Sequence, residues 1–561
     1  MDETNKKVIL AFALSFAVLV LWRMVFPPPL PEAPPAKSAA PASSTAQKPA
    51  GPAPSPAPTV PAAPVALAVQ QGTQAEEIVV ENDVARITFS TEGAVVKSWV
   101  LKNFTDLKGQ PLNVVNHAAS TTLGFPMNLG LPDQEMAKKL NLALYLATPS
   151  GSTLTAPTKL EFVYSDGKIQ VRKTFSFGTG YEVRAEVSVF DGQRYYPTEV
   201  VWSGGFGDHS LPVEAKESVN HVLTGSLEKL ENEPQRDFKE DRTTPAPLQL
   251  AGMDDRYFAL VFLPDAPDQV ALRAGRRTWN PPDWKEKEPP RETFAALVSL
   301  LPKPLAFRVF LGPKDLDVLK AVNPPLEKLV DFGWFSFVAR PLFLAMRYIY
   351  DRWTHNYGWA IVLLTVLINL AMFPLKLKQL RSAQEMQRIA PLVKSIQEKY
   401  KGYKFNDPRK QKMNQEVMKL YQEHHINPLS GCLPMVIQLP FLYGFYKVLD
   451  LSIELRHAPW FAWIKDLSAR DPLYILPTLL IVTTFVSMKM TPMTSADPAQ
   501  QRMMMIMPIF FGFMFYSFAS GLVLYWLTGN VIGIGQQMLI NRLMPTPAPA
   551  APPRKAGSKE A

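Results

Sequence analysis

Polar side chains recur inside apolar segments in the last third of this 561-residue chain. They are Thr365 and Asn369 in one segment, Thr483, Thr484 and Ser487 in a second, and Asn530 and Gln537 in a third. Spacings of four and seven residues place side chains on one face of a helix. Hydrogen bonding between helices explains any one of them. Three polar stripes together predict a partly hydrated cavity, which would lower the cost of bringing polar peptide segments into a membrane.

The same segments lack the residues that most reactions require. No Asp, Glu or His lies well inside any of them, which argues against a proton relay or a coupling-ion site. The chain has no phosphate-binding loop, dinucleotide fingerprint or nucleophile elbow. Adjacent His424 and His425 have no further ligands at a suitable spacing. We therefore expect a protein that is not an enzyme and that uses no cofactor and no metal.

Six apolar runs are candidate membrane spans. They are residues 8–26, 357–375, 428–449, 472–488, 503–519 and 521–540. Residues 376–425 carry twelve Lys/Arg against five Asp/Glu, whereas 450–471 carry three against four. Because basic loops stay in the cytoplasm, both termini are expected there. A cleaved signal peptide at 8–26 is the alternative for the first run.

The composition between these runs divides the chain into regions. Residues 27–64 contain fourteen prolines and predict an extended tether. From about residue 76 apolar residues alternate, as in 181–189, and predict an antiparallel β-sandwich or barrel. The expected regions are a membrane anchor (1–26), a linker (27–75), an exported all-β domain (76–320), an interfacial amphipathic helix (321–350), a five-helix core (351–541) with a cytoplasmic hairpin (376–426), and a basic tail (542–561).

The hairpin carries a row of basic residues on helically spaced apolar sequence. They are Lys376, Lys378, Arg381, Arg388 and Lys394. Such residues contact lipid headgroups, or meet ribosomal RNA and nascent chains by charge. No base-reading motif is present, so DNA is not an expected partner.

Several motifs in the last third resemble one known family. In order they are NPLSGCLP at 427–434, IQLP at 437–440, LSARDP at 467–472, KMTP at 489–492 and SGLVLYW at 520–526. Together they resemble the YidC membrane protein insertases, and the anchor and large exported domain resemble the Gram-negative branch of that family.

The resemblance implies an insertase and folding chaperone of the bacterial inner membrane. It implies that nascent membrane proteins enter through a hydrophilic groove, without nucleotide hydrolysis, alone or with the Sec translocon. Ribosome contact through the hairpin and the tail is implied as well, as is a periplasmic supersandwich similar to sugar mutarotases. By position, the residues that resemble groove-lining places are Thr365, Pro434, Gln438, Pro440 and Trp526.

One position departs from the family pattern. Many members have an arginine where this chain has Asn369. Asn369 hydrates and hydrogen-bonds but carries no charge, so attraction of acidic substrate segments must come from elsewhere. Lys376, Lys378 and Arg381 are the candidates, and groove hydration is expected to matter more than a fixed charge.

Three other functions fit parts of the sequence. A scaffold for membrane complexes without insertion activity is the runner-up. A small-solute transporter also needs polar residues at the membrane midplane, but the core shows no internal repeat. An anchored carbohydrate-active enzyme would use the exported domain, whose histidines are only His117, His209 and His221 and lack an evident acid/base constellation.

Overall fold

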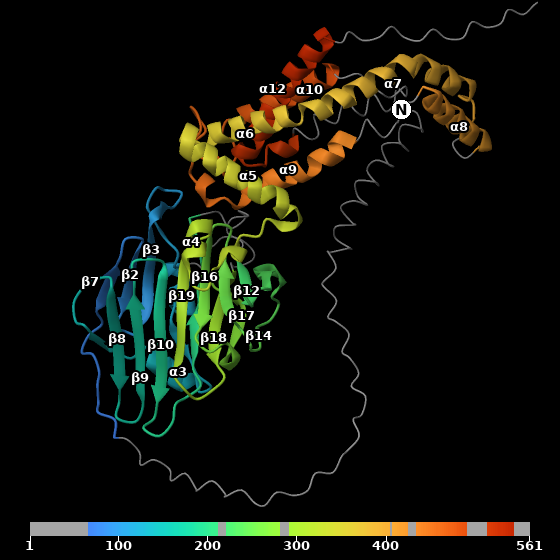
Figure 1. The fold of residues 1–561 in the computed structure, drawn as a ribbon. Coiled ribbons are helices and arrows are strands. Elements are labelled where there is room, and N and C mark those ends of the chain that lie inside the picture. Colours follow the sequence, from blue (N-terminus) through green and yellow to red (C-terminus); the bar gives the residue numbers. More distant parts are fainter. Residues whose placement is uncertain are drawn as a thin grey trace, which may run out of the picture. The chain divides into compact units, whose positions relative to one another are not determined.

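A computed structural model describes residues 66–210, 220–280, 291–403, 407–424, 433–490 and 513–543, all within one compact unit (Figure 1). The expected anchor, the linker up to residue 65, residues 503–512 of the expected fifth span and the tail from residue 544 lie outside these ranges.

The residues from Glu77 onward form three open sheets. The largest has nine strands, in the order β13 (Leu230–Pro234), β12 (His221–Gly225), β15 (Leu250–Asp254), β16 (Phe258–Pro264), β19 (Leu305–Pro313), β10 (Glu182–Phe190), β9 (Gln170–Phe177), β8 (Thr158–Ser165) and β6 (Leu146–Thr148). A five-stranded sheet has the order β4 (Pro111–Asn113), β3 (Val95–Thr105), β2 (Ala85–Ser90), β1 (Glu77–Glu81) and β7 (Thr153–Thr155). The other has the order β14 (Arg242–Thr244), β17 (Val270–Thr278), β18 (Arg291–Ser299), β11 (Glu199–Trp202) and β5 (Asn128–Gly130).

The sequence pattern explains these strands. In β10 the alternate residues Val183, Ala185 and Val187 are buried, as their period of two predicts. The expected turn at 165–167 joins β8 to β9. Among the described strands β1 and β7 form the parallel pair. Since all three sheets have free ends, the fold is a sandwich rather than a barrel.

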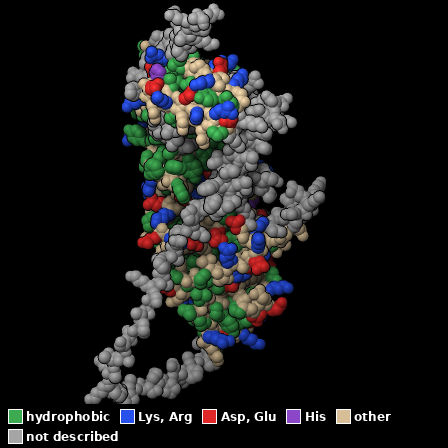
Figure 2. Space-filling view, turned by 90° about the vertical axis from the view of Figure 1, so that its right-hand side faces the viewer, with side chains coloured by type: hydrophobic (Ala, Val, Ile, Leu, Met, Phe, Trp, Pro, Cys, Tyr) green, Lys and Arg blue, Asp and Glu red, His purple; other side chains and the backbone are tan. Residues whose placement is uncertain are grey.

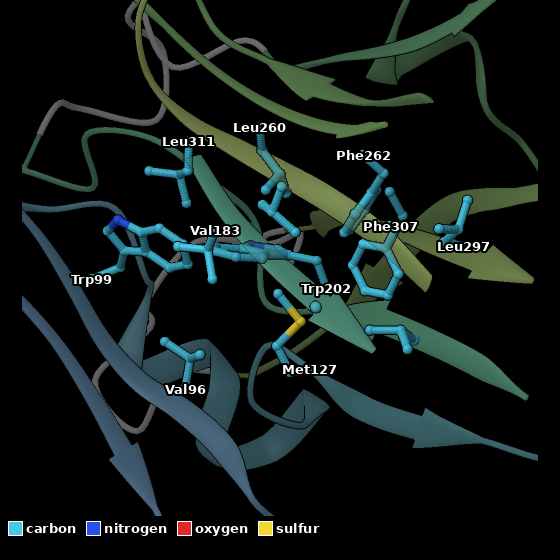
Figure 3. Packing of buried hydrophobic residues seen from close by; sticks show 14 of the residues in the cluster. Val96, Trp99, Met127, Val183, Trp202, Leu260, Phe262, Leu297, Phe307 and Leu311 are labelled. Carbon is cyan, nitrogen blue, oxygen red and sulfur yellow. The ribbon is translucent and has the colours of Figure 1, made fainter. Parts of the chain in front are cut away.

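One hydrophobic core joins the inner faces of the three sheets. Figure 3 shows Trp99 of β3 and Trp202 of β11 among aliphatic and aromatic residues of the nine-stranded sheet. The two indole rings are 6.2 Å apart between centroids, and both are almost fully buried. Three short helices complete the domain: α2 (His117–Leu123), α3 (Gln134–Asn141) and α4 (Leu316–Ala321).

The described chain after the sandwich is mainly helical, apart from the loop between α9 and α10. The helices are α5 (Ser336–Ile349), α6 (Tyr357–Ala371), α7 (Phe373–Lys399), α8 (Pro408–Glu423), α9 (Leu433–Leu451), α10 (Ile475–Met490) and α12 (Ser520–Leu543). Among them, no single helix meets the length and hydropathy criteria for a membrane span, but the segment Gly333–Thr354 together with α6 meets them as a pair bent by 116°.

Two of the expected helix boundaries differ from the structure. The run 357–375 was expected to be one helix, but α6 ends at Ala371 and α7 starts at Phe373. Pro374 explains the break, because proline suits the first turn of a helix and disfavours helical geometry before it. The interfacial helix was expected from residue 321, but its long α-helical part, α5, starts only at Ser336. A turn precedes it, in which Asp331 accepts a hydrogen bond from the Gly333 amide.

The loop after α9 packs against the sandwich. Ile453 belongs to the sandwich core, and Arg456 pairs with Asp208 at 2.5 Å with both side chains nearly inaccessible to solvent. Arg256 of the sandwich also pairs with Asp450 at the end of α9, at 3.0 Å. Removing one partner of such a pair would destabilise the contact, because the other charge would remain buried without compensation.

Lys173 of β9 is fully buried among the described residues of the sandwich. Its ammonium donates to the carbonyl oxygens of Gly93 (2.7 Å), Ala94 (3.2 Å) and Met127 (2.8 Å). Burial disfavours the charged form and lowers the pKa of Lys173 to about 7. The three carbonyl acceptors favour the charged form, because an ammonium has three N–H donors. Ala94 and Met127 have left-handed backbones, with φ of 48° and 70°. The lysine thus holds two loops in conformations that side-chain-bearing residues rarely adopt.

We expect Lys173→Met to loosen these loops, because methionine fills similar space but donates no hydrogen bond. Losing hydrogen bonds from a charged group should lower the local opening free energy by about 2–3 kcal/mol. Amide hydrogen exchange of residues 93–96 and 127–130 in the full-length protein should then accelerate roughly 30-fold or more. Lys159→Met, at an exposed position of β8, is the matched control. Equal exchange in both variants would show that Lys173 does not hold the loops.

Candidate functional site

Asn369 is the centre of a hydrogen-bond cluster at the end of α6. Its Nδ2 donates to the Thr365 carbonyl oxygen at 2.8 Å, one turn earlier. Its Oδ1 accepts from Lys376 Nζ at 2.7 Å, and its carbonyl oxygen accepts from Gln536 Nε2 at 3.2 Å. Lys376 Nζ also donates to Gln536 Oε1 at 3.2 Å. One lysine and two amide side chains, from three helices, therefore supply one another's hydrogen-bond partners.

The break between α6 and α7 positions Lys376. Because α7 starts at Phe373, Lys376 lies in its first turn and reaches back to the end of α6. The sequence suggested a basic contact on the cytoplasmic hairpin, with Lys376 at most at the mouth of a groove. The structure instead has Lys376 half-buried in a cavity with Asn369.

Gln536 is a site residue that the sequence interpretation missed. We expected Asn530 and Gln537 to share a polar face, but Gln537 is half-buried and donates to Asn541 on its own helix at 2.9 Å. The signal was present in the spacing of Gly529, Gly533 and Gln536, which lie on one helix face at intervals of four and three. A Cβ added at Gly529 would come within 4.0 Å of Thr365 and Asn369. Gly529 therefore lies in ordinary packing distance of α6.

A second polar cluster joins α10 to α12. Asn530 Nδ2 donates to Thr484 Oγ1 at 2.7 Å, with Thr483 Oγ1 further away at 3.5 Å. Both threonine hydroxyls donate to carbonyl oxygens one turn earlier in α10. The threonine side chains therefore supply the acceptors that an amide needs in an apolar bundle.

The two clusters border one cavity of about 170 Å³. Its lining residues are Asn369, Lys376, Leu442, Ser487, Tyr525, Trp526, Gly529, Asn530 and Gly533. No carboxylate is among these residues, so the ammonium of Lys376 is the charge in the lining. The volume is far above the roughly 10–15 Å³ that one water molecule needs. The cavity can accept water or a polar peptide segment.

The other candidate residues fall into three groups. Thr365 is fully buried and donates to the Ile361 carbonyl oxygen, and Pro440 is half-buried in α9, so neither lines the cavity. Lys378, Arg388 and Lys394 are exposed on α7. The third group consists of side chains that lie outside the described part of the chain: Arg381, Pro434 and Gln438.

Helices α7 and α8 pack as the hairpin that the sequence predicts, with a break between residues 399 and 408. Tyr400 Oη donates to Glu416 Oε1 at 2.7 Å, and Asp407 caps the start of α8. Figure 2 shows charged side chains of this hairpin at the top of the view. The surface available to a partner is therefore strongly polar.

Large apolar side chains are exposed on α5, α6, α10 and α12. The most exposed on each are Phe337 (72%), Leu370 (57%), Val482 (52%) and Leu543 (71%). Soluble monomers rarely expose apolar surface on so many neighbouring helices, whereas lipid makes it favourable. No group of His, Cys, Asp and Glu in the described ranges could hold a metal ion.

Comparison with known proteins agrees with this arrangement. The family model for the 60Kd inner membrane protein matches residues 349–547, and that for the YidC periplasmic domain matches residues 77–345. The membrane protein insertase YidC of Syntrophus aciditrophicus is 34% identical over 562 residues, covering 96% of this chain and 99% of that protein. The insertase of Citrifermentans bemidjiense is 36% identical over 570 residues, covering 96% and 99%.

Among solved structures, an active YidC insertase matches with a TM-score of 0.35 and 21% identity, covering 83% of this chain and 94% of the other. The sequence relatives decide the assignment, since their identity extends over nearly the whole chain. They place the helical core and the β-rich periplasmic domain in one protein of the inner membrane. The chain belongs to the YidC family of membrane protein insertases.

Proposed function

We propose that the cavity bordered by Asn369, Lys376 and Asn530 is part of the groove through which this insertase takes up polar segments of nascent membrane proteins. The observation that carries the proposal is the hydrogen-bonded cluster of Lys376, Asn369 and Gln536 in a bundle with exposed apolar faces. A polar segment would exchange water for amide and hydroxyl partners there, which lowers its transfer cost. The apolar segment of the same client protein would pass into lipid. No nucleotide is needed for either step.

Lys376 supplies the fixed charge of this groove. A carboxylate of a client within about 4 Å of its ammonium gains of the order of 4 kcal/mol at an effective dielectric constant of ~20, and desolvation offsets part of this. Asn369 and Gln536 hold the ammonium by neutral acceptors, so its charge is not cancelled by an ion pair. The charge thus enters the groove from α7, seven residues after the position where many relatives carry arginine.

The remaining features of the proposal concern topology and partners. Six spans with both termini in the cytoplasm would put the β-domain outside and the basic hairpin inside. Exposed Lys378, Arg388 and Lys394 would meet the ribosome or lipid headgroups by charge. Aromatic residues exposed on and beside α5, such as Trp334 and Tyr348, suit the membrane interface. The Sec translocon is the partner for clients with large exported loops.

Reconstitution tests autonomous insertion. Liposomes that contain only the purified protein should protect the exported tail of a small single-spanning client from protease, without nucleotide and above empty liposomes. Protection no greater than in empty liposomes, with protein shown to be folded, would contradict autonomous insertion.

Lys376→Leu should selectively impair a client whose exported tail carries two aspartates. We expect about a tenfold lower insertion rate, the equivalent of ~1.4 kcal/mol, and little change for the same client with asparagines. Lys378→Leu, two residues away and exposed, is the matched control, and Lys376→Arg should retain activity. An equal loss for both clients would mean that Lys376 acts only through folding.

Two substitutions at Asn369 separate hydration from charge. Asn369→Asp keeps the cavity polar but pairs with Lys376, so insertion of the acidic client should fall while that of the neutral client persists. Asn369→Leu removes the amide, and insertion of both clients should fall severalfold. Insertion rates are measured in the same liposomes. The control is Gln537→Leu, at a half-buried position of α12 that does not line the cavity. If Asn369→Leu left the insertion rates of both clients unchanged, the proposal that groove hydration aids insertion would be wrong.

A further inference from the structure

The α9–α10 loop, residues 452–474, contacts the first residues of three helices. These helices are α6, α10 and α12, which carry Asn369, the Thr483–Thr484 pair and Asn530. The first N–H groups of a helix have no partner within the helix, so groups outside it must satisfy them. At each of the three helix starts, the α9–α10 loop either supplies such a partner or holds the residue that does.

Asp471 joins the loop to the start of α10. Its Oδ2 accepts from the Leu476 amide at 2.7 Å, and its Oδ1 accepts from the Leu473 amide and from Trp463 Nε1, both at 3.0 Å. The Asp471 side chain is almost fully buried. Removing its carboxylate would take the acceptor from three donors and would free Trp463 from α10.

Two backbone carbonyl groups of the loop bind the start of α12. The Ala469 oxygen accepts from the Ser520 amide at 2.7 Å and from Ser520 Oγ at 2.9 Å. The Leu467 oxygen accepts from the Gly521 amide at 2.9 Å. The sequence motifs LSARDP and SGLVLYW therefore meet in space.

Asn356 ties the start of α6 to the same loop. Its Oδ1 accepts from the Trp359 amide at 3.1 Å, and its Nδ2 donates to the carbonyl oxygens of Pro459 and Trp460 at 3.1 and 3.2 Å. A Cβ added at Gly358 would lie 2.1 Å from the Trp460 ring. The indole therefore packs directly on the first turn of α6.

The loop is packed firmly enough to hold these helix starts in place. Leu455, Ile464 and Leu467 are buried in the core of the helical part. The buried pair of Arg456 with Asp208 connects the loop to the sandwich. The three helices therefore start from one fixed segment.

The polar residues of α10 and α12 lie at similar depths below the loop. Thr484 is nine residues after Ile475, the first of α10, and Asn530 is ten residues after Ser520, the first of α12. At 1.5 Å per residue both lie about 14–15 Å along their helices, where they form the 2.7 Å hydrogen bond. A slip of α12 by two residues, about 3 Å, would separate the pair beyond hydrogen-bond distance.

Apolar packing fixes this register only weakly. Lipid is as apolar as the side chains, so contacts between the helices have no hydrophobic driving force in a membrane. The cavity of about 170 Å³ also removes packing contacts between the helices that line it. Polar contacts at the helix starts therefore matter more here than in a densely packed bundle.

We propose that the α9–α10 loop sets the axial register of α6, α10 and α12, with Asp471 as its main positioning residue. With the three helix starts held at fixed heights, the polar side chains meet at the cavity. The register is a property of the fold alone, whereas its effect on insertion rests on the function proposed for the cavity.

Spin labels test the register directly. Val482→Cys on α10 and Val531→Cys on α12, both at exposed positions, are labelled in full-length protein that carries Cys432→Ser. Pulsed electron paramagnetic resonance in lipid nanodiscs measures the distance between the labels. Asp471→Ala should broaden the distance distribution or shift it by about 1.5–3 Å, the rise of one or two residues. Trp463→Phe, which keeps a ring but loses the Nε1 donor, should have a smaller effect in the same direction.

Two further variants separate register from general damage to the loop. Asp466→Ala is the matched control, because the Asp466 carboxylate accepts from the amide and hydroxyl of Ser468 inside the loop rather than from a helix start. It should leave the distance unchanged. Asp471→Asn keeps an acceptor oxygen for Trp463 and should largely restore the parent distance.

Insertion is measured in liposomes with the acidic and the neutral client. Asp471→Ala should slow both clients about fivefold, the factor that one lost hydrogen bond represents, whereas Lys376→Leu should slow only the acidic one. Unchanged label distances in folded Asp471→Ala and Trp463→Phe would overturn the register assignment, and Trp463→Phe alone decides if Asp471→Ala does not fold. Changed distances with unchanged insertion would overturn the positioning role of Asp471. If the parent protein inserts neither client, the proposed function fails, and the label distances still decide the register.

Discussion

A polar side chain inside an apolar helix bundle must find its partners in neighbouring helices, and the functional core of this protein depends on that constraint. Asn369 shows it most clearly, with α6 satisfying its amide, α7 its side-chain oxygen and α12 its backbone oxygen. Each partner also fixes the helix it comes from. Asn369 and Lys376 therefore connect the helices of the bundle and also line its cavity.

The chain combines these roles with small residues. Gly529 and Gly533 line the cavity beside Asn369 and place no side chain in it, so open space remains between the polar groups. Larger residues would fill that space and gain packing energy, but they would remove the polar surface on which the proposed uptake of client segments depends. A cavity in a helix bundle lowers stability, and the hydrogen-bond clusters on both sides of α12 offset part of this loss.

The sandwich follows the opposite rule, with a dense aromatic and aliphatic core and polar groups at its margins. Lys173 and the Arg456–Asp208 pair are exceptions in which buried charge fixes loops and connects the sandwich to the loop after α9. The sandwich has a cavity of its own, whose lining shares no residue with the cavity of the helical core.

The sequence by itself determined the local elements. Alternating apolar residues predicted strands such as β10, and the break at 401–408 predicted the hairpin, because both depend on neighbours in the chain. The motifs and the polar stripes pointed to the family and to Asn369 and Asn530. Charge asymmetry between loops predicted a topology that the described helices do not test.

Only the tertiary structure decided which polar residues meet. Lys376 was expected as a basic contact of the cytoplasmic hairpin or as a charge at the groove mouth, and its contact with Asn369 follows from the break before Phe373, where α7 begins. Gln536 rather than Gln537 completes the cluster, since one position along a helix rotates a side chain by about 100° and only packing against α6 selects between them. Contacts between residues 160 positions apart, such as Lys376 and Gln536, leave no local pattern in the chain, because they arise from how helices pack and not from the order of neighbouring residues.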